Sequence, residues 1–148
     1  MIPTHLTDGR LPEGIHAATW AEVVHRFSFT ARRRALLARI LPALVHLRDA
    51  GCSRVWLTGS FVRTKPNPMD VDVVWDVTGV DPDALHEMFM GPSGLPLIKA
   101  VFGADLFPSH IVEGASNLPF VEFFQMTRDG RPCGIVLLDL YTLDLDTL

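Results

Sequence analysis

Asp70 and Asp72 are the residues whose type and spacing point most directly to chemistry. They open a Val-rich run that is typical of a buried strand. Side chains two apart in a strand share a face, so the two carboxylates project together while Val71 and Val73 face the other side. Two adjacent carboxylates repel, and Mg²⁺ removes that repulsion while keeping positions free for water and phosphates. The spacing predicts a metal site; the alternative is a solvated acidic strand face.

A glycine and a serine lie upstream of this pair, where an earlier apolar run over residues 55–57 breaks at Gly59 and Ser60. Gly59 provides the backbone freedom for a tight turn whose N–H groups can approach an anion closely. Ser60 adds a hydroxyl donor beside them. The sequence therefore predicts a phosphate cradle at the end of one strand, facing the carboxylate pair of the next.

Gly59-Ser60, nine further residues and then Asp70-Val71-Asp72 together resemble a known signature. It is that of the nucleotidyltransferase fold shared by polymerase-β-like enzymes and the small minimal nucleotidyltransferases. The wider run, from residues 11–16 to residues 134–136, also resembles an uncharacterised family of small bacterial and phage proteins with this expected fold. The resemblance implies that the Gly-Ser turn holds the triphosphate of an NTP and that the aspartates hold two Mg²⁺ ions.

The resemblance also implies a third carboxylate from a later strand, and Asp105 is the candidate. Asp105 lies among apolar neighbours, where a carboxylate is costly unless it is paired or liganded. Its alternative role is to cap a turn at a strand end. Asp139, near the end of a later apolar run, is a rival for the same position. Arg63 and Lys65, in the loop after the turn, are expected to reach the leaving pyrophosphate or to be simply solvated.

The reaction implied by the resemblance is transfer of a nucleoside monophosphate from an NTP to a protein or RNA acceptor, in a toxin-antitoxin or phage-defence pair. The competing interpretation is a non-catalytic module that keeps the fold to bind a nucleotide or a partner. A small-molecule acceptor would require a homodimer, because the chain has no evident second domain to build that acceptor site.

Length and composition limit the alternatives. The 148 residues suit one domain with one buried core, and 48% hydrophobic residues argue against general disorder. Thirteen basic and seventeen acidic residues give a net charge of -4, which argues against a large nucleic-acid footprint. The two cysteines and six histidines show no metal-ligand spacing. No leader or membrane-spanning window is recognisable, so a cytoplasmic protein is expected.

The resemblance implies an α/β (α+β) fold with a mixed, mostly antiparallel central sheet and helices packed against it, and hydrophobic periodicity locates the helices and strands. The single domain begins with an extended arm over residues 1–18. Thr19 and Thr30 fit helix N-caps, and Pro42 should kink or break the longer of the two helices. Arg32 to Arg34 form either a solvated helix face or a basic patch. The expected helices are residues 19–26, 31–50, 82–90 and a segment from 117; the expected later strands are 101–107 and 134–140.

Overall fold

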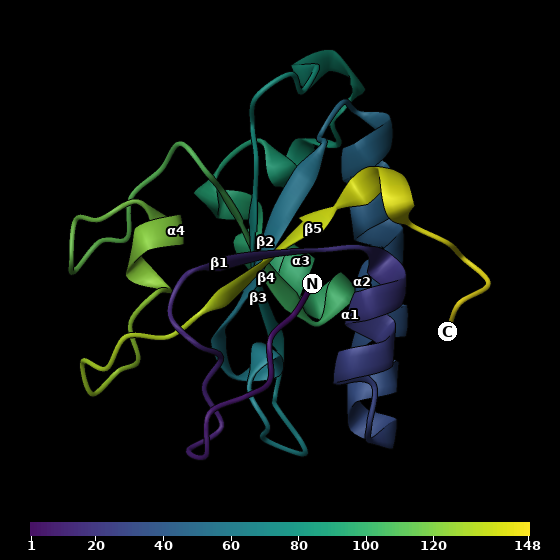
Figure 1. Cartoon of the computed structure of the whole chain (residues 1–148). Coiled ribbons are helices and arrows are strands. Elements are labelled where there is room, and N and C mark those ends of the chain that lie inside the picture. Colours follow the sequence, from purple (N-terminus) through teal and green to yellow (C-terminus); the bar gives the residue numbers. More distant parts are fainter.

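The computed structural model describes residues 1–148 and contains one five-stranded mixed sheet (Figure 1). The two central pairings, β5 with β2 and β2 with β3, are antiparallel, and the two outer pairings are parallel. The expected mixed α/β fold with helices packed against the sheet is thus confirmed, but antiparallel pairings make up half of the sheet, where a mostly antiparallel sheet was expected. The strand order is β1-β5-β2-β3-β4, and the bounds are β1 Ile15–Ala18, β2 Arg54–Thr58, β3 Val71–Trp75, β4 Ala104–Pro108 and β5 Ile135–Asp139.

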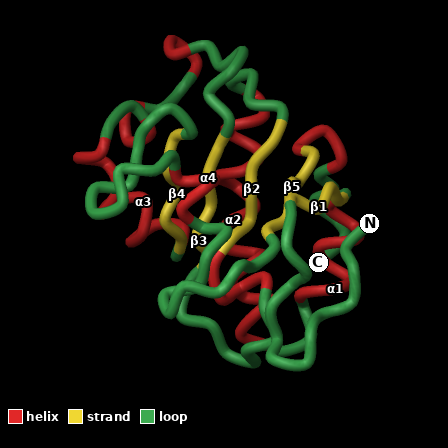
Figure 2. The backbone as a smooth tube through the Cα atoms, turned by 60° about the vertical axis from the view of Figure 1, so that its left-hand side comes forward, coloured by secondary structure: helices red, strands yellow, loops and turns green.

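The helices cover the two faces of the sheet unequally (Figures 1 and 2). One face carries α1 (Trp20–Phe27), α2 (Ala31–Asp49) and α3 (Leu95–Phe102), and the main core of 29 buried residues lies there. The other face carries only the short α4 (Phe120–Phe123) and its loops, over a small cluster that includes Trp56 and Phe120. Asp72, Val74 and Phe107 alternate with core residues along their strands, so they face this thinly covered side.

The two predicted N-caps are confirmed. The Thr19 hydroxyl accepts a hydrogen bond from the Glu22 N–H, and the Thr30 hydroxyl accepts one from the Arg33 N–H. The leucine-rich face of α2 is buried against the sheet, and each such side chain contributes about 1.5–3 kcal/mol by leaving water. The break considered at Pro42 is absent, because α2 runs without interruption from Ala31 to Asp49.

Three segments differ from the expectation. Residues 82–90 form two separate 3₁₀ turns in place of a helix, Pro82–Ala84 and Glu87–Phe89. The apolar run before Asp105 is mostly helix, because α3 occupies Leu95–Phe102 and only then does β4 begin. Gly103 makes this transition in the left-handed conformation, with φ +66°. The N-terminal arm ends in β1, which pairs with β5 from Ile15 opposite Ile135 and so joins the sheet.

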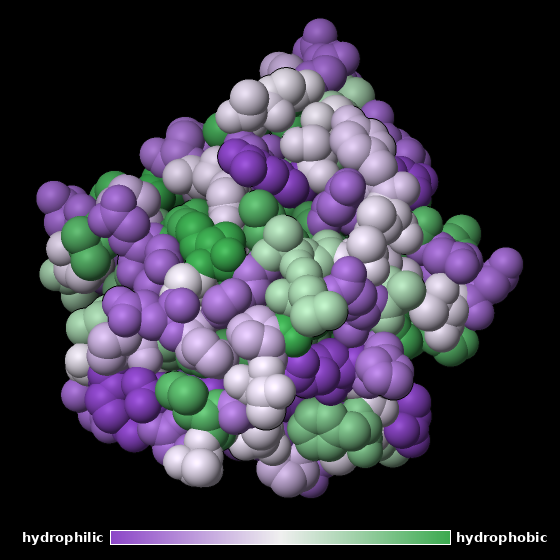
Figure 3. Space-filling view, viewed as in Figure 1, coloured by the Kyte–Doolittle hydropathy of each residue, from purple (hydrophilic) through white to green (hydrophobic).

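The surface is mixed in character. On the face shown in Figure 3, hydrophilic residues predominate and the exposed apolar residues lie in small, separate groups. None of the helices combines the length and the hydropathy needed to span a bilayer.

Candidate metal centre

The Gly-Ser turn lies directly beside Asp72. Strand β2 ends at Thr58, whose hydroxyl donates a 2.8 Å hydrogen bond to the Asp72 carbonyl oxygen. Gly59 then opens a 3₁₀ turn over Gly59–Val62 with φ +72°, a conformation that favours glycine. A Cβ atom at Gly59 would lie 2.8 Å from the Asp72 carboxylate oxygen Oδ2. The turn and the carboxylate therefore approach each other as closely as a glycine allows.

Three carboxylates converge at this end of the sheet, which we call the carboxylate end. Asp72 on β3 and Asp105 on β4 are opposite each other in the parallel register, so their side chains project from the same face. Asp70 lies two residues before Asp72, at the entrance to β3. One oxygen from each of the three lies within 4.8 Å of the others. The structure therefore brings together all three aspartates that the sequence nominated as metal ligands.

Lys99 on α3 occupies the middle of this cluster. Its Nζ atom donates to the Asp70 carboxylate and, at 3.1 Å, to Asp105 Oδ2, whereas it makes no hydrogen bond to Asp72. Sequence reasoning did not identify this lysine. The available signal was Pro96 at the start and Gly103 just past the end of a short segment, which is typical of a helix and would have placed Lys99 before Asp105.

The charges of the cluster are incompletely balanced. The pKa of Asp72 is raised to about 7, mainly by burial and then by the negative charges of Asp70 and Asp105, which the positive charge of Lys99 only partly offsets. Burial lowers the pKa of Lys99, but the hydrogen bonds and charges of Asp70 and Asp105 outweigh it, so that pKa is raised and the ammonium stays charged at neutral pH. One lysine thus faces three carboxylates, and Asp72 lacks a cationic partner.

The donor set matches a hard divalent cation. Carboxylate oxygens at this spacing suit Mg²⁺, which takes a few protein oxygens and leaves positions for water and phosphate. No histidine or cysteine belongs to the cluster, so a zinc site of the usual nitrogen and sulfur ligands is not indicated. Asp70, Asp72 and Asp105 are the residues that would hold the ion.

A buried arginine holds the loop that follows the Gly-Ser turn. Arg33 on α2 is fully buried, and its guanidinium donates to the carbonyl oxygens of Phe61 at 2.6 Å, Arg63 at 2.7 Å and Lys65 at 2.7 Å. It also lies 4.3 Å from the centre of the Phe29 ring. Burial lowers the pKa of Arg33 to about 10. For Arg33 both expectations, solvated face and basic patch, were wrong: this side chain fixes the backbone of the loop.

The remaining candidates fall at different places. The Ser60 hydroxyl is half-buried in the turn and makes no hydrogen bond to the protein. The Arg63 guanidinium extends toward Cys133, with Nη2 3.8 Å from its Sγ, so it does not join the carboxylates. The Lys65 side chain is exposed and has no hydrogen-bond partner. Ser60 and Lys65 are thus free to contact a ligand, whereas Arg63 is turned toward the start of β5.

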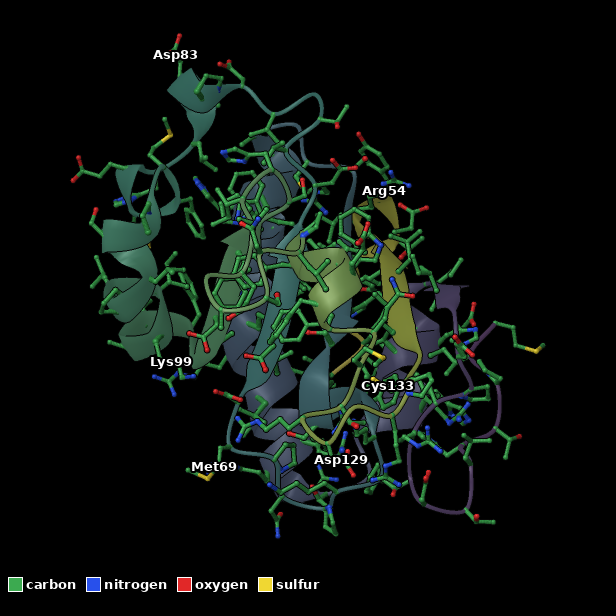
Figure 4. All side chains as sticks on the ribbon, turned by 90° about the vertical axis from the view of Figure 1, so that its left-hand side faces the viewer. Arg54, Met69, Asp83, Lys99, Asp129 and Cys133 are labelled. Carbon is green, nitrogen blue, oxygen red and sulfur yellow. The ribbon has the colours of Figure 1, made fainter.

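Asp139 is excluded as the third carboxylate. It pairs in register with Arg54 at the start of β2, whereas Asp72 pairs with Thr58 at the end of that strand. Asp139 therefore lies at the opposite end of the sheet, which we call the far end. Figure 4 shows the same separation, with Lys99 and Met69 toward one end of the molecule and Arg54 and Asp83 toward the other. A shallow cavity of about 310 Å³ lined by Arg54, Asp139 and Tyr141 lies at the far end.

Comparison with known proteins identifies a family and no function. No curated protein and no solved structure matches this chain. Residues 3–139 match the family described as "Family of unknown function (DUF6932)". This span includes every strand and all three carboxylates of the cluster. The chain therefore belongs to the DUF6932 family.

Proposed function

We propose that this chain is a Mg²⁺-dependent nucleotidyltransferase that moves a nucleoside monophosphate from an NTP to a hydroxyl of a protein or RNA acceptor. The observation that carries the proposal is the convergence of three aspartates from two neighbouring strands beside the Gly59 turn. A further support is the raised pKa of Asp72, which is due first to burial and then to the charges of Asp70 and Asp105, because strongly perturbed acids of this kind are typical of functional sites.

In the proposed reaction the acceptor oxygen bonds to the α-phosphorus, the bond from that phosphorus to the α,β-bridging oxygen breaks, and pyrophosphate leaves. The hydroxyl proton passes to Asp105. Ser60 and the Gly59 backbone contact the terminal phosphates, and Lys65 approaches the pyrophosphate from the exposed loop. Divalent cations held by the aspartates would supply charge neutralisation at the attacking and leaving oxygens. The chain's own part is positioning and electrostatic complementarity.

The experiment is to incubate the protein with each α-labelled NTP, Mg²⁺ and a cell lysate, and to ask whether label reaches protein or RNA. We expect transfer with the native chain and a loss of about 100-fold or more in Asp70→Asn and Asp105→Asn, comparable to removing one preorganised charge-stabilising group. Asp139→Asn is the matched control, since it neutralises an aspartate at the far end. Label transfer that persists in Asp70→Asn would refute the proposal.

One observation favours a second candidate, a non-catalytic binding module. Lys99 already pairs with two of the three carboxylates, as a lysine would if it had replaced a metal permanently. Calorimetric titration with an NTP separates the two candidates. Binding that requires Mg²⁺ and is lost in Asp70→Asn supports the enzyme, whereas NTP binding that is indifferent to Mg²⁺ and to this substitution supports the module.

A further inference from the structure

We propose that the Lys99 ammonium and a divalent cation are alternative occupants of the carboxylate cluster, so that entry of the metal releases Lys99 to pair with the phosphates of the bound nucleotide. The second half of this inference rests on the proposed function, and the first half does not. The two halves are tested separately below.

The Lys99 ammonium occupies the position that a cation shared by Asp70 and Asp105 would take. Lys99 Nζ lies within hydrogen-bonding distance of carboxylate oxygens on both Asp70, just before β3, and Asp105, within β4. A metal ion bridging the same two oxygens would meet the ammonium at close range, and two positive charges a few ångströms apart repel strongly. Lys99 and the metal therefore exclude each other from this position.

The balance of charge favours the metal once it is present. Asp72 has no hydrogen bond to Lys99, and the single positive charge of the lysine balances only one of the three negative charges. A divalent ion can contact all three, because their nearest oxygens lie within 4.8 Å of one another. A divalent ion would thus bring two positive charges in place of one, and it would also contact Asp72, which Lys99 does not.

Lys99 can leave the cluster without any change of the helix that carries it. Its side chain is 41% exposed, so its ammonium has a path to water. The helix itself is fixed, because Ile98 is buried in the main core and the Arg39 guanidinium donates to the carbonyl oxygens of Ala100 and Val101. A flexible four-carbon stem on a fixed helix keeps the released charge close to the cluster. An anion bound by the metal is then its nearest partner.

The first test is calorimetric titration of Mn²⁺ into the full chain without nucleotide. Lys99→Met should bind Mn²⁺ about 10-fold or more tightly than the native chain, because the competing charge is gone. Lys99→Arg keeps a positive charge and should stay within about 3-fold of the native affinity, while Arg128→Met, which removes an exposed and unpaired cation elsewhere, should leave it unchanged. Equal or weaker Mn²⁺ binding by Lys99→Met would overturn the competition.

Thermal melts guard against a purely structural explanation. Without metal, Lys99→Met should melt below the native chain, because the aspartates lose their only counter-charge. At saturating Mn²⁺ the two should melt together. A deficit that stays the same with and without Mn²⁺ would mean that Lys99 is only a structural ion-pair partner, and it would also overturn the proposal.

The second test is binding of pyrophosphate and of a non-hydrolysable NTP at saturating Mg²⁺. Lys99→Met should bind both about 10-fold more weakly, because one charge contact to the phosphates is lost. Unchanged affinity would refute the phosphate role of Lys99 and leave the metal competition standing. If the native chain itself binds neither compound, the proposed function fails, and the Mn²⁺ titration still decides the competition.

Discussion

The two ends of the sheet both carry aspartates, but folding shifts the pKa values of Asp76 and Asp72 in opposite directions. At the far end, Asp76 is buried and receives hydrogen bonds from the Arg54 guanidinium at 2.7 Å and the Thr78 N–H at 3.0 Å. Burial alone would raise the pKa of Asp76, yet these bonds hold it below its usual value. At the carboxylate end, three aspartates share one lysine, and the pKa of Asp72 is raised. Asp76 thus has its hydrogen-bond donors and its counter-charge within the chain, whereas the three aspartates at the carboxylate end share a single positive charge.

The difference is the one expected between an acid with a structural role and an acid of a ligand site. Asp76 has its partners within the chain and needs no ligand. Asp72 is stabilised only if a cation arrives from outside or a proton stays on. Perturbed acids with an incomplete set of partners are typical of functional sites. Substitutions at the two ends should therefore change stability in different directions.

The largest effect is expected for Arg33→Met, which removes the guanidinium that fixes the loop at the carboxylate end. The carbonyl oxygens of Phe61, Arg63 and Lys65 lose a buried donor, so the free energy of unfolding should fall by about 3–5 kcal/mol. Chemical denaturation measures this change. Arg32→Met is the control, since Arg32 is exposed, and should cost less than about 1 kcal/mol. Equal losses in the two variants would show that burial of Arg33 contributes nothing.

The second prediction compares Asp72→Asn with Asp76→Asn in metal-free buffer at pH 8. Asn at position 72 removes a desolvated and repelled charge, so the free energy of unfolding should rise by about 2–3 kcal/mol. Asp76→Asn removes charge-assisted hydrogen bonds, so the free energy of unfolding should fall by about 1–2 kcal/mol. Urea denaturation gives both values. Losses in both variants would remove the distinction between the two ends.

The pH dependence follows from the same pKa shifts. The pKa of Asp72 is about 7 when folded and near 3.8 when unfolded, so the native state holds its proton longer and stability falls as the pH rises from about 4 to 7. The gain from Asp72→Asn should therefore be much smaller at pH 5 than at pH 8. The pKa of Asp76 is lowered by folding, so its contribution is present above the unfolded pKa and is lost only on acidification.

A smaller effect is expected for Gly59→Ala, with Gly130→Ala as the matched control. Both glycines have positive φ, +72° and +83°, so both substitutions should cost about 1 kcal/mol of backbone strain. Only at Gly59 would the new Cβ atom meet the Asp72 carboxylate, whereas nothing lies within 4 Å at Gly130. Weaker Mn²⁺ binding in Gly59→Ala alone would place the turn in the metal centre. The same Mn²⁺ affinity in both variants would contradict that placement.

The smallest effect is expected at the far end, for Asp139→Asn. The Asp139 side chain accepts a hydrogen bond from the Tyr141 N–H, and Asn caps such a turn nearly as well, so stability should change by less than about 0.5 kcal/mol. Mn²⁺ affinity, measured by titration, should not change either. A clear loss of Mn²⁺ binding would mean that the two ends are coupled through the sheet.

The sequence predicted the aspartates because their signal is local. Alternation within a Val-rich strand placed Asp70 and Asp72 on one side, and Asp105 was chosen because the resemblance implied a third carboxylate and an acid is costly in an apolar run. The helix over residues 31–50 was predicted from its Thr30 cap and leucine spacing, and α2 ends one residue earlier. These features depend on neighbours within a few residues.

The features that sequence reasoning missed depend on contacts between residues that are far apart in the sequence. Arg33 reads as one of three exposed arginines, and only the loop that folds over it from residues 61–65 buries its charge. Lys99 was missed because its helix is short and apolar at every other position, so no period separated it from the strand that follows. The pairing of β1 with β5 joins residues 120 positions apart, from Ile15 to Ile135, and no local pattern encodes it.

The position of β5 has a consequence for synthesis on the ribosome. This strand lies between β1 and β2, so the last strand to be translated is an inner one. Until it emerges, the edges of β1 and β2 that β5 will cover are unpaired, and such edges invite association with other chains. A product cut short before residue 135 would keep those edges open and be exposed to quality control. The sheet is complete only after the whole of β5 has been translated.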